Sequence, residues 1–323
     1  MMSYRRAMMV AFLTVSACQL SAQQDVSRIP SEGNKQWRSG LTVHLVGYED
    51  IPKGDSGIVE ITSRDVAFVR GEEEVRLSRS QIISAAEDDE RRETGGAAGK
   101  IVRFAVPYGG GALIGAFSQK QVGLLTLDYI DMSGGLHSAV FIMSKADATV
   151  AADQLALDAL VHPSTVHTAT PSRCDGAQSP LVLRVSTVDA SQGVVLAPEY
   201  RAVLYEHLVQ LPKEKTHFDR MMRQGDSSAE CAPYVLSLHV EKLSKGSDVA
   251  RTVSGPAGLF VSVTKVHVHV VVSDQNGNVV LDRVVKSSRR GDSESLNAAD
   301  SAANAIAKSL RHLSSKVLKQ DSE

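Results

Sequence analysis

The chain has little net charge and few cysteines, and each shortage excludes a class of protein. Its 35 basic and 37 acidic residues give a formal net charge of −2, so we expect no nucleic-acid partner. Its three cysteines lack the Cys-x-x-Cys or nearby histidine spacing of a zinc site. No apolar run after residue 17 reaches the roughly 18 residues that a membrane-spanning helix needs. The 43% hydrophobic content indicates a globular protein with an ordinary core.

Complete catalytic motifs are also missing. Gly54-Asp55-Ser56-Gly57 copies the tetrapeptide around the nucleophile of trypsin-like proteases, but only His44 precedes it and we expect a turn. Residues 94–101 (TGGAAGKI) lack the first glycine and the final hydroxyl of a phosphate-binding loop. Residues 274–279 begin like a calcium loop, but Val279 replaces the required glycine, so Asn276-Gly277 predicts a hairpin turn. The sequence therefore predicts no enzyme and no cofactor.

The amino terminus is the most informative segment. Arg5 and Arg6 precede an apolar run over residues 7–17, which has the length of a signal-peptide core. Val15-Ser16-Ala17-Cys18 resembles the lipobox of bacterial lipoproteins. The resemblance implies that residues 1–17 are removed and that Cys18 carries acyl chains, which would anchor the protein to membrane lipid. We then expect it in the bacterial cell envelope, on the periplasmic side of the outer membrane or on the cell surface.

Ordinary signal-peptide cleavage after Ala22 is the alternative, and it would release a soluble secreted protein. Leu20 is a poor residue at the −3 position of such a site. Gln19 follows the lipobox cysteine, so an aspartate-type signal for retention in the inner membrane is absent.

Lipidation of Cys18 would leave Cys174 and Cys231 as a pair. In an oxidising extracytoplasmic compartment, an even pair predicts a disulfide. Two buried free thiols are the alternative.

Residues 18–40 carry Pro30, Gly33 and Gly40 and are interpreted as a tether, and residues 41–161 as a first domain. Strands are expected at residues 41–46, 57–62, 65–69, 75–77, 81–83, 100–106, 123–129 and 137–143. A helix over residues 147–161 follows, and the charged run at residues 87–93 is expected to be a solvated loop.

The first domain contains the segment GIVEITSRDVAFVRGEEEVRLSRSQI, followed by KQVGLLTLDYIDMSGGLHSAVFIM and then a helix. On these segments, the domain resembles the pleckstrin-homology-like superfold and its GRAM-type bacterial relatives. The resemblance implies a β-barrel closed by a C-terminal helix. Such domains often bind lipid headgroups or peptides, although the basic pocket of phosphoinositide binders has no counterpart here.

Residues 162–180 hold three prolines and are interpreted as a linker. Residues 181–319 predict a separate second domain. Its expected elements are a strand at 181–188, a helix at 198–211 with Pro198 first, strands at 234–243, 259–273 and 279–286, and a last helix capped by Asp292 or Ser293. Apolar and polar residues alternate in the strands at 234–243 and 259–273. The first helix is expected to bury one narrow stripe with Tyr200, Leu204, Leu208 and Leu211, and the last helix a stripe from Leu296 to Val317. This order predicts an antiparallel-sheet α/β sandwich, so the whole chain is expected to be α+β.

The segment KGSDVARTVSGPAGLFVSVTKVHVHVVVSDQNGNVVLDRVV resembles an uncharacterised domain of bacterial lipoproteins. In layout the second domain is similar to the amino-terminal α/β domain of the Tol-system propeller protein and to the periplasmic domain of the curli secretion-channel lipoprotein. The resemblance implies a role in envelope assembly or trafficking and supplies no catalytic residues.

Two further sets of residues are candidate sites. The apolar, glycine-rich segment with Gly109, Gly110, Gly111, Leu113, Ile114 and Phe117 could contact a partner or membrane, or it could be a buried hairpin tip. His239, His267 and His269 could share a strand face and bind a metal ion, although solvent-facing histidines are the simpler interpretation.

We therefore expect a membrane-anchored, non-enzymatic binding or envelope-assembly module, with an unidentified envelope protein as its partner. An extracytoplasmic metal-binding protein or hydrolase that uses the histidine face is one alternative. An oligomeric secretion component is the other.

Overall fold

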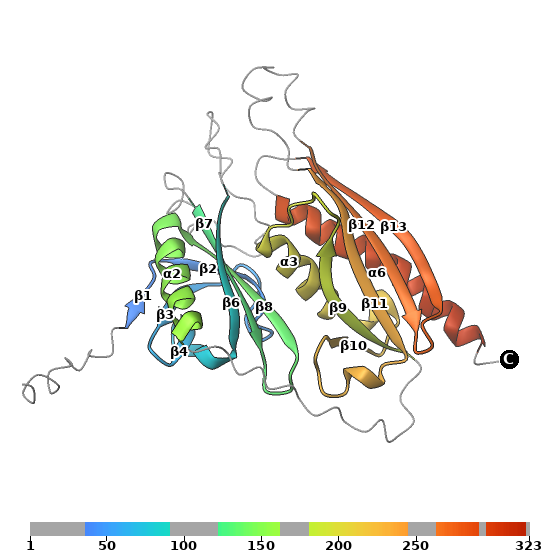
Figure 1. Ribbon diagram of the computed structural model, residues 1–323, viewed down its shortest axis with the longest axis horizontal. Coiled ribbons are helices and arrows are strands. Elements are labelled where there is room, and N and C mark those ends of the chain that lie inside the picture. The colour runs from blue at the N-terminus through green and yellow to red at the C-terminus, as the bar shows by residue number, and fades with distance from the viewer. Residues whose placement is uncertain (1–35, 91–121, 162–180, 245–262, 291–294, 321–323) are drawn as a thin grey trace, which may run out of the picture.

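The computed structural model describes residues 36–90, 122–161, 181–244, 263–290 and 295–320. They form two units, each built on one sheet with helices against it (Figure 1). The predicted α+β class is confirmed. Within these residues, no helix has both the length and the apolar character needed to span a membrane.

The first unit consists of strands and one long helix, α2. Its elements are β1 (Trp37–Arg38), β2 (Thr42–Val46), β3 (Ser56–Ile61), β4 (Asp65–Arg70), β5 (Glu73–Ser78), η1 (Arg79–Gln81), β6 (Ile82–Glu90), β7 (Val122–Ile130), β8 (Leu136–Ser144) and α2 (Lys145–Val161). The eight-stranded sheet runs β5-β4-β3-β2-β8-β7-β6, with β1 added on β3. Its pairings are antiparallel.

The hydrogen-bonded path of this sheet is not a closed barrel within the described residues. Its two ends, β5 and β6, are consecutive in the chain but do not pair. The 3-10 turn η1 separates them, and Gln81 fixes that corner because its side chain accepts a hydrogen bond from the Ser78 amide, 3.1 Å away. After this turn, β6 pairs with β7 and not with β5, so the sheet stays open.

A single apolar cluster fills the inside of this bent sheet. Val59 and Phe68 come from one half of the path, Leu125 and Phe141 from the other, and Ala151 from α2. The two halves therefore enclose one core, and α2 closes its side.

Two parts of the sequence interpretation change here. The charged run was predicted to be a loop, but strand β6 continues through Glu87 to Glu90 and pairs Glu87 with Leu125. A strand at the end of a sheet tolerates such a run because charged side chains there can reach solvent. Trp37 and Arg38, within the predicted tether, add strand β1 opposite Ile61 and Glu60.

The second unit holds the other sheet. Its elements are β9 (Val182–Ala190), α3 (Pro198–Val209), α4 (Lys213–Thr216), β10 (Arg220–Arg223), η2 (Ala229–Cys231), β11 (Tyr234–Ser244), β12 (Val263–Asp274), β13 (Val279–Arg290) and α6 (Ser295–Gln320). The five-stranded sheet runs β10-β9-β11-β12-β13.

This sheet is mixed, so the prediction of an antiparallel sheet was wrong in part. β11, β12 and β13 are antiparallel, but β9 pairs in parallel with both β10 and β11. The reason is the connection from β9 to β10, because a helix crossover returns the chain in the same direction. The short strand β10 has no periodic pattern of its own, and the sequence did not predict it.

One face of the second sheet packs against α3 and α6. The alternating apolar residues predicted for β11 and β12 are buried on this face, among them Leu236, Leu238, Val268 and Val270. The predicted stripe of α6 is buried from Leu296 to Val317. Hydrophobic periodicity therefore predicted these elements correctly.

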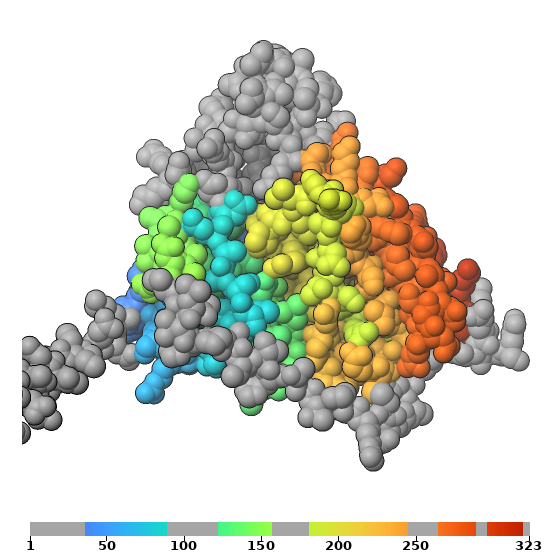
Figure 2. All heavy atoms as spheres, in the orientation of Figure 1, coloured from blue at the N-terminus to red at the C-terminus, as the bar shows by residue number. Residues whose placement is uncertain are grey.

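Helix α3 lies between the two units and joins their cores. Eight of its twelve residues are buried, because strands β7 and β8 of the first unit cover the side that the sheet and α6 leave open. Leu124 and Val140 of the first sheet belong to the same apolar cluster as Tyr200 and Leu204 of α3. In the space-filling view, the first unit (blue to green) abuts the second (yellow to red) (Figure 2). The two units therefore pack together through this shared apolar cluster, and the first unit also has a cluster of its own.

Candidate functional site

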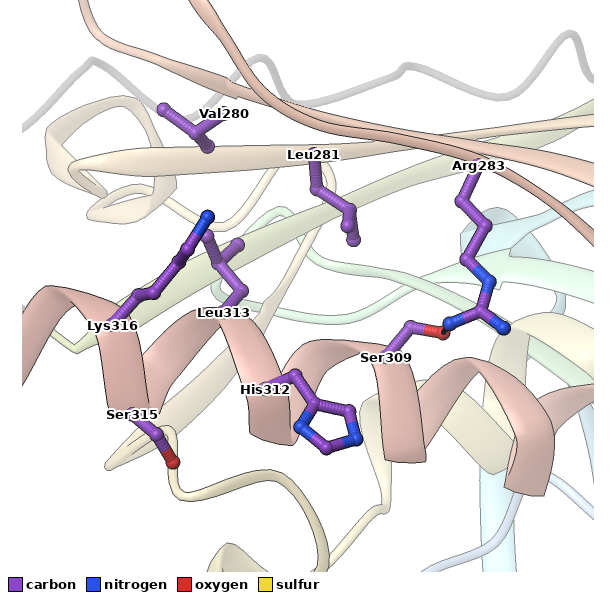
Figure 3. A pocket seen from close by; sticks show the side chains of 8 residues that line it. All are labelled: Val280, Leu281, Arg283, Ser309, His312, Leu313, Ser315 and Lys316. Atoms are coloured by element: carbon purple, nitrogen blue, oxygen red, sulfur yellow. Dashed lines mark hydrogen bonds between the residues drawn. The ribbon is translucent and has the colours of Figure 1, made fainter.

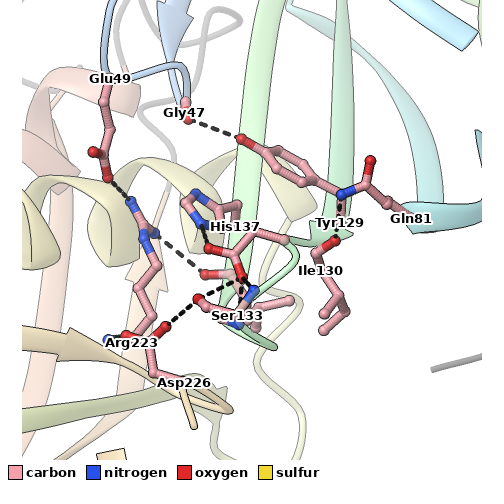
Figure 4. Close-up of polar contacts among 12 residues, drawn as sticks. Gly47, Glu49, Gln81, Tyr129, Ile130, Ser133, His137, Arg223 and Asp226 are labelled. Carbon is pink, nitrogen blue, oxygen red and sulfur yellow. Dashed lines mark hydrogen bonds and ion pairs between the residues drawn. The ribbon is translucent and has the colours of Figure 1, made fainter. Parts of the chain in front are cut away.

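A polar cluster occupies one end of the contact between the units (Figure 4). We call it the junction cluster, and it consists of Glu49, Asp131, Ser133, His137, Glu206, Arg223 and Asp226. The first unit supplies the loop after β2 and the turn between β7 and β8, and the second supplies α3, β10 and the turn after β10. The residues that meet here are as far as 174 positions apart in the chain.

The centre of the junction cluster is a buried ion pair. The two Nη atoms of Arg223 lie 2.8 and 2.9 Å from the two carboxylate oxygens of Glu206. Arg223 also donates to Glu49 Oε1 (2.9 Å) and to the carbonyl oxygen of Leu136 (3.2 Å). The amide of Ser138 donates to Glu206 Oε1 at 2.8 Å. Because Glu49, Leu136 and Ser138 belong to the first unit, the Arg223–Glu206 ion pair of the second unit connects the two units.

Burial and pairing set the charge states of this pair. Burial raises the pKa of Glu206, and the Arg223 guanidinium opposes that rise. Burial would lower the pKa of Arg223, but attraction to Glu206 outweighs it and the pKa is raised. Arg223 therefore stays cationic. Burial also raises the pKa of Tyr205 to about 12, so its hydroxyl stays neutral and accepts a hydrogen bond from the Gln224 amide (3.0 Å).

The turn between β7 and β8 is built around Asp131. Its Oδ1 accepts hydrogen bonds from the amides of Ser133 and Gly135, each at 2.8 Å, and its Oδ2 lies 3.0 Å from His137 Nε2. Burial would raise the pKa of Asp131, but the hydrogen bonds from Ser133, His137 and Gly135 outweigh it and the pKa is lowered. The His137 ring stacks on Tyr129, with ring centroids 4.9 Å apart.

This turn docks directly on the chain that follows β10. Ser133 Oγ lies 2.9 Å from Asp226 Oδ1. The Leu136 amide donates to the Gln224 carbonyl (2.9 Å), and the Ser227 amide donates to the Ser133 carbonyl (3.1 Å). Gly225 has a φ of +85°, and a Cβ added there would lie 2.4 Å from the carbonyl oxygen of Gly134. Only glycine allows so close an approach of the two backbones.

A polar cleft of about 610 Å³ opens beside the junction cluster, where Gln210 and Arg220 join its walls. A hydrolase would need a nucleophile within hydrogen-bond reach of its base. The Ser133 hydroxyl instead donates to Asp131 and lies against Asp226. His137 Nδ1 is buried and has no hydrogen-bond partner among the described atoms. The geometry fits a structural connection, with room for a small polar ligand.

Two more ion pairs connect the units away from this cleft. Lys53, in the loop between β2 and β3, lies 2.7 Å from Asp300 of α6. The same Asp300 carboxylate also pairs with His207 of α3, within the second unit. Arg201 of α3 pairs with Asp128 of β7. The contact is therefore fixed at several points as well as by the shared core.

Most of the predicted site residues lie outside the described residues. They include Cys18, Cys174, residues 94–101 and the interaction segment Gly109, Gly110, Gly111, Leu113, Ile114 and Phe117. Cys231 lies buried in η2. The bridge between Cys174 and Cys231 stays a prediction.

The histidine face is only partly assembled. β11 and β12 place His239 opposite His269, so these two of the three histidines are neighbours. Each already has another partner, because His239 Nε2 lies 2.8 Å from Ser191 Oγ and His269 Nε2 lies 2.7 Å from Asp282 Oδ1. The described part of the chain contains no group of three or more metal-binding side chains, so these residues do not form a ready metal site.

The protease-like tetrapeptide and the calcium-like segment are both turns, as predicted. Gly54 has a φ of +90°, and Ser56 begins β3. His44 is buried, which lowers its pKa, and its ring nitrogens face the Tyr48 amide and the Pro52 carbonyl. In the other turn, Asp274 Oδ1 accepts from the amides of Asn276 and Asn278.

The sequence interpretation missed the junction cluster. The sequence did contain one signal that the outer face of β7 and β8 is covered. Both strands are almost continuously apolar, and such strands are commonly buried on both faces. Their burial patterns confirm this, with seven or eight consecutive buried residues in each. An element that packs on the outer face of β7 and β8 could therefore have been predicted. No sequence pattern connected Arg223, Glu206 and Glu49, which lie far apart in the chain.

Comparison with known proteins finds no matching family model and no matching curated protein. The PelC dodecamer from Paraburkholderia phytofirmans is 21% identical over 42% of this chain and 91% of that chain, with a TM-score of 0.28. Protein XCC0632 from Xanthomonas campestris, of family DUF330, is 15% identical over 48% of this chain and 94% of that chain, also with a TM-score of 0.28. Similarity at this level carries no argument about function, which must come from the residues of this chain.

Proposed function

We propose that this protein is a membrane-anchored, extracytoplasmic bacterial lipoprotein that acts as a non-enzymatic binding or assembly module of the cell envelope. The observation that carries the proposal is Val15-Ser16-Ala17-Cys18 after a short basic and apolar segment. Acyl chains on Cys18 would attach the molecule at its amino terminus. Two or three chains hold a protein stably on a membrane, since each buried CH₂ contributes about 0.8 kcal/mol.

The junction cluster supports a module more than an enzyme. Its central charged groups, Arg223 and Glu206, bind each other across the two units. Active sites instead keep a nucleophile or base available to substrate. A rigid two-unit body on a lipid anchor suits the presentation of a fixed surface to another envelope protein.

We also propose that the first unit is a PH-like module. Strands β2 to β8 enclose one core and are followed by helix α2, which is the order that the resemblance implies. This interpretation favours a peptide as the ligand, because the basic pocket of phosphoinositide binders has no counterpart in the sequence.

The intact mass of the mature protein, extracted from membranes without reduction, tests the anchor. We expect a chain that starts at Cys18, carries acyl chains and is two hydrogens lighter because Cys174 and Cys231 are bridged. A chain that starts at Gln23 without lipid would refute the anchor.

Two matched variants sharpen the test. Cys18→Ala should move the protein from the membrane to the soluble fraction without changing its thermal unfolding. Gln19→Asp keeps the lipid but adds the inner-membrane retention signal, so it should change which membrane holds the protein. Cross-linking in intact cells should yield an envelope partner with wild type that is lost with Cys18→Ala. The same partners for both would contradict a role for anchoring.

A further inference from the structure

Strand β13 is an exposed edge of the second sheet, on the side away from the first unit (Figure 1). Within the described residues, its only strand partner is β12. It is twelve residues long, and Val279, Val280 and Val284 on it are 56%, 38% and 39% exposed. Long apolar edges are usually blocked because they pair with other chains. Charged side chains limit such pairing to partners of matching charge, and β13 exposes Asp282, Arg283 and Lys286 among its valines.

The charges along β13 specify how it could pair. Asp282, Val284 and Lys286 alternate on the face that also carries His267 and His269. In an antiparallel pair about a twofold axis through Val284, Val284 faces its own copy and Asp282 faces Lys286 of the second copy. The symmetry produces this attractive pair twice.

We propose that β13 pairs with β13 of a second copy of this chain, antiparallel and in the register centred on Val284. The neighbouring twofold registers are worse. A centre at Arg283 sets Asp282 opposite Val284 and Lys286 opposite Val280, so no attractive pair forms, and a centre at Asp282 places two aspartates opposite each other. A centre at Val285 sets Lys286 opposite Val284 and leaves both charged residues without a partner. The proposal does not depend on the lipid anchor.

The side chains that would form the pairs are available. Asp282 is 64% exposed, although its Oδ1 contacts His269. Lys286 is exposed and has no ion-pair partner within the described residues. The Arg283 side chain turns toward α6, where its Nη1 lies 3.4 Å from Ser309 Oγ (Figure 3). That orientation takes its charge away from the edge and from Arg283 of a second copy.

A groove beside this edge would be covered by the same contact. It has a volume of about 390 Å³ between β13 and α6. Figure 3 shows Val280 and Leu281 on one side and Leu313 and Lys316 on the other. A strand added to β13 would lie along this groove and remove its apolar residues from water, which favours association.

Cross-linking through one position tests the register. In Val284→Cys, the two new thiols would face each other with Cβ atoms about 5 Å apart, so mild oxidation should give a covalent dimer of the full-length membrane-extracted protein on a non-reducing gel. Val280→Cys is the matched control. It lies on the same strand and is similarly exposed, but its own copy would be many residues away, so it should not cross-link. Equal cross-linking of both variants would overturn the register.

Charge reversal tests the pairing by a second route. Asp282→Lys and Lys286→Asp should each weaken self-association about tenfold, because two attractive pairs become repulsive. The double variant Asp282→Lys/Lys286→Asp should restore it. A mixture of the two single variants should form mixed dimers in preference to dimers of either variant alone.

Sedimentation velocity of the detergent-extracted full chain measures these associations, and thermal unfolding confirms that each variant is folded. A wild-type monomer at tens of micromolar would overturn the proposal, as would single reversals that leave the dimer unchanged. In the first case an acidic peptide would be the better candidate for a groove whose charged residues, Arg283, His312 and Lys316, are basic.

Discussion

The second unit uses two very different surfaces on its two sides. On one side, α3 is largely buried against the first unit, and the Arg223–Glu206 pair is almost removed from solvent. On the other side, β13 exposes three valines and charged side chains of both signs, Asp282, Arg283 and Lys286. A buried charge pair allows one geometry only, because any other leaves a charge unpaired in the interior. An exposed edge adds little to folding stability but leaves its hydrogen-bonding groups available to a partner.

Removal of one partner of the buried pair should give the largest effect. Arg223→Met leaves Glu206 buried beside the Ser138 amide without its counter-charge, and we expect the free energy of unfolding to fall by about 3–5 kcal/mol. Chemical denaturation measures it. The double variant Arg223→Met/Glu206→Gln keeps an acceptor for Ser138 and should recover much of the loss. A loss below about 1 kcal/mol in the single variant would mean that the pair is not desolvated.

A close backbone contact inside the first unit, between the chain after β2 and strand β8, should give the next effect. Gly47 has a φ of +111°, and a Cβ there would lie 2.3 Å from the carbonyl oxygen of Ser138 on β8. Gly47→Ala should lower the unfolding free energy by about 3 kcal/mol through strain and overlap. Gly71→Ala is the control, since Gly71 also has a positive φ (+60°) but has no atom within 4 Å of the new methyl group. It should lose only about 1 kcal/mol. Equal losses would remove the argument for close packing.

The ion pairs around Asp300 should make the contact between the units sensitive to acid. Burial would raise the pKa of Asp300, but His207 and Lys53 outweigh it and the pKa is lowered. A carboxyl group with a lowered pKa stabilises the fold above its unfolded pKa of about 3.9 and loses that contribution as pH falls through the folded value.

Asp300→Asn should therefore cost about 1 kcal/mol near pH 7 and progressively less below about pH 4. Denaturation of wild type and variant at several pH values between 3 and 7 measures the difference. A cost that is constant over this range would assign the effect to packing and not to charge.

The smallest effect on folding is expected at the free edge. Val284→Thr on β13 should change the free energy of unfolding by less than about 0.5 kcal/mol, because the side chain is exposed. The same change should weaken self-association, which sedimentation velocity would detect. A large loss of folding stability would show that Val284 packs in the core and would remove the contrast between the two surfaces.

Local patterns in the sequence predicted much of the second unit. Alternating apolar and polar residues predicted β11 and β12, and the apolar stripe from Leu296 to Val317 predicted α6. The dipeptide Asn276-Gly277 predicted the turn before β13. These signals were sufficient because each element buries one face. The expected apolar stripe of α3 was too narrow, since Tyr205 and Glu206 are buried as well. The first unit determines which further sides of α3 are buried. The spacing of apolar residues within the helix cannot reveal that contact.

The remaining misses have the same origin in long-range contacts. β6 keeps Glu87 and Asp88 in a strand because β7 pairs with them, and β10 is four residues that β9 holds in register. The junction cluster joins residues from four segments, so spacing along the chain could not reveal it. The predicted sites at Cys18, Cys174 and residues 109–117 lie outside the described residues and stay predictions.

Helix α3 has one more consequence, for how the polypeptide could be divided. Its buried side chains share one hydrophobic cluster with Leu124 and Val140 of the first unit, so either half produced alone would expose part of that cluster to water. Proteolytic cleavage between residues 162 and 173, which keeps Cys174 and Cys231 on the same fragment, should leave two fragments that co-elute and melt together. The same halves, expressed from two genes in one cell, should reassemble by fragment complementation.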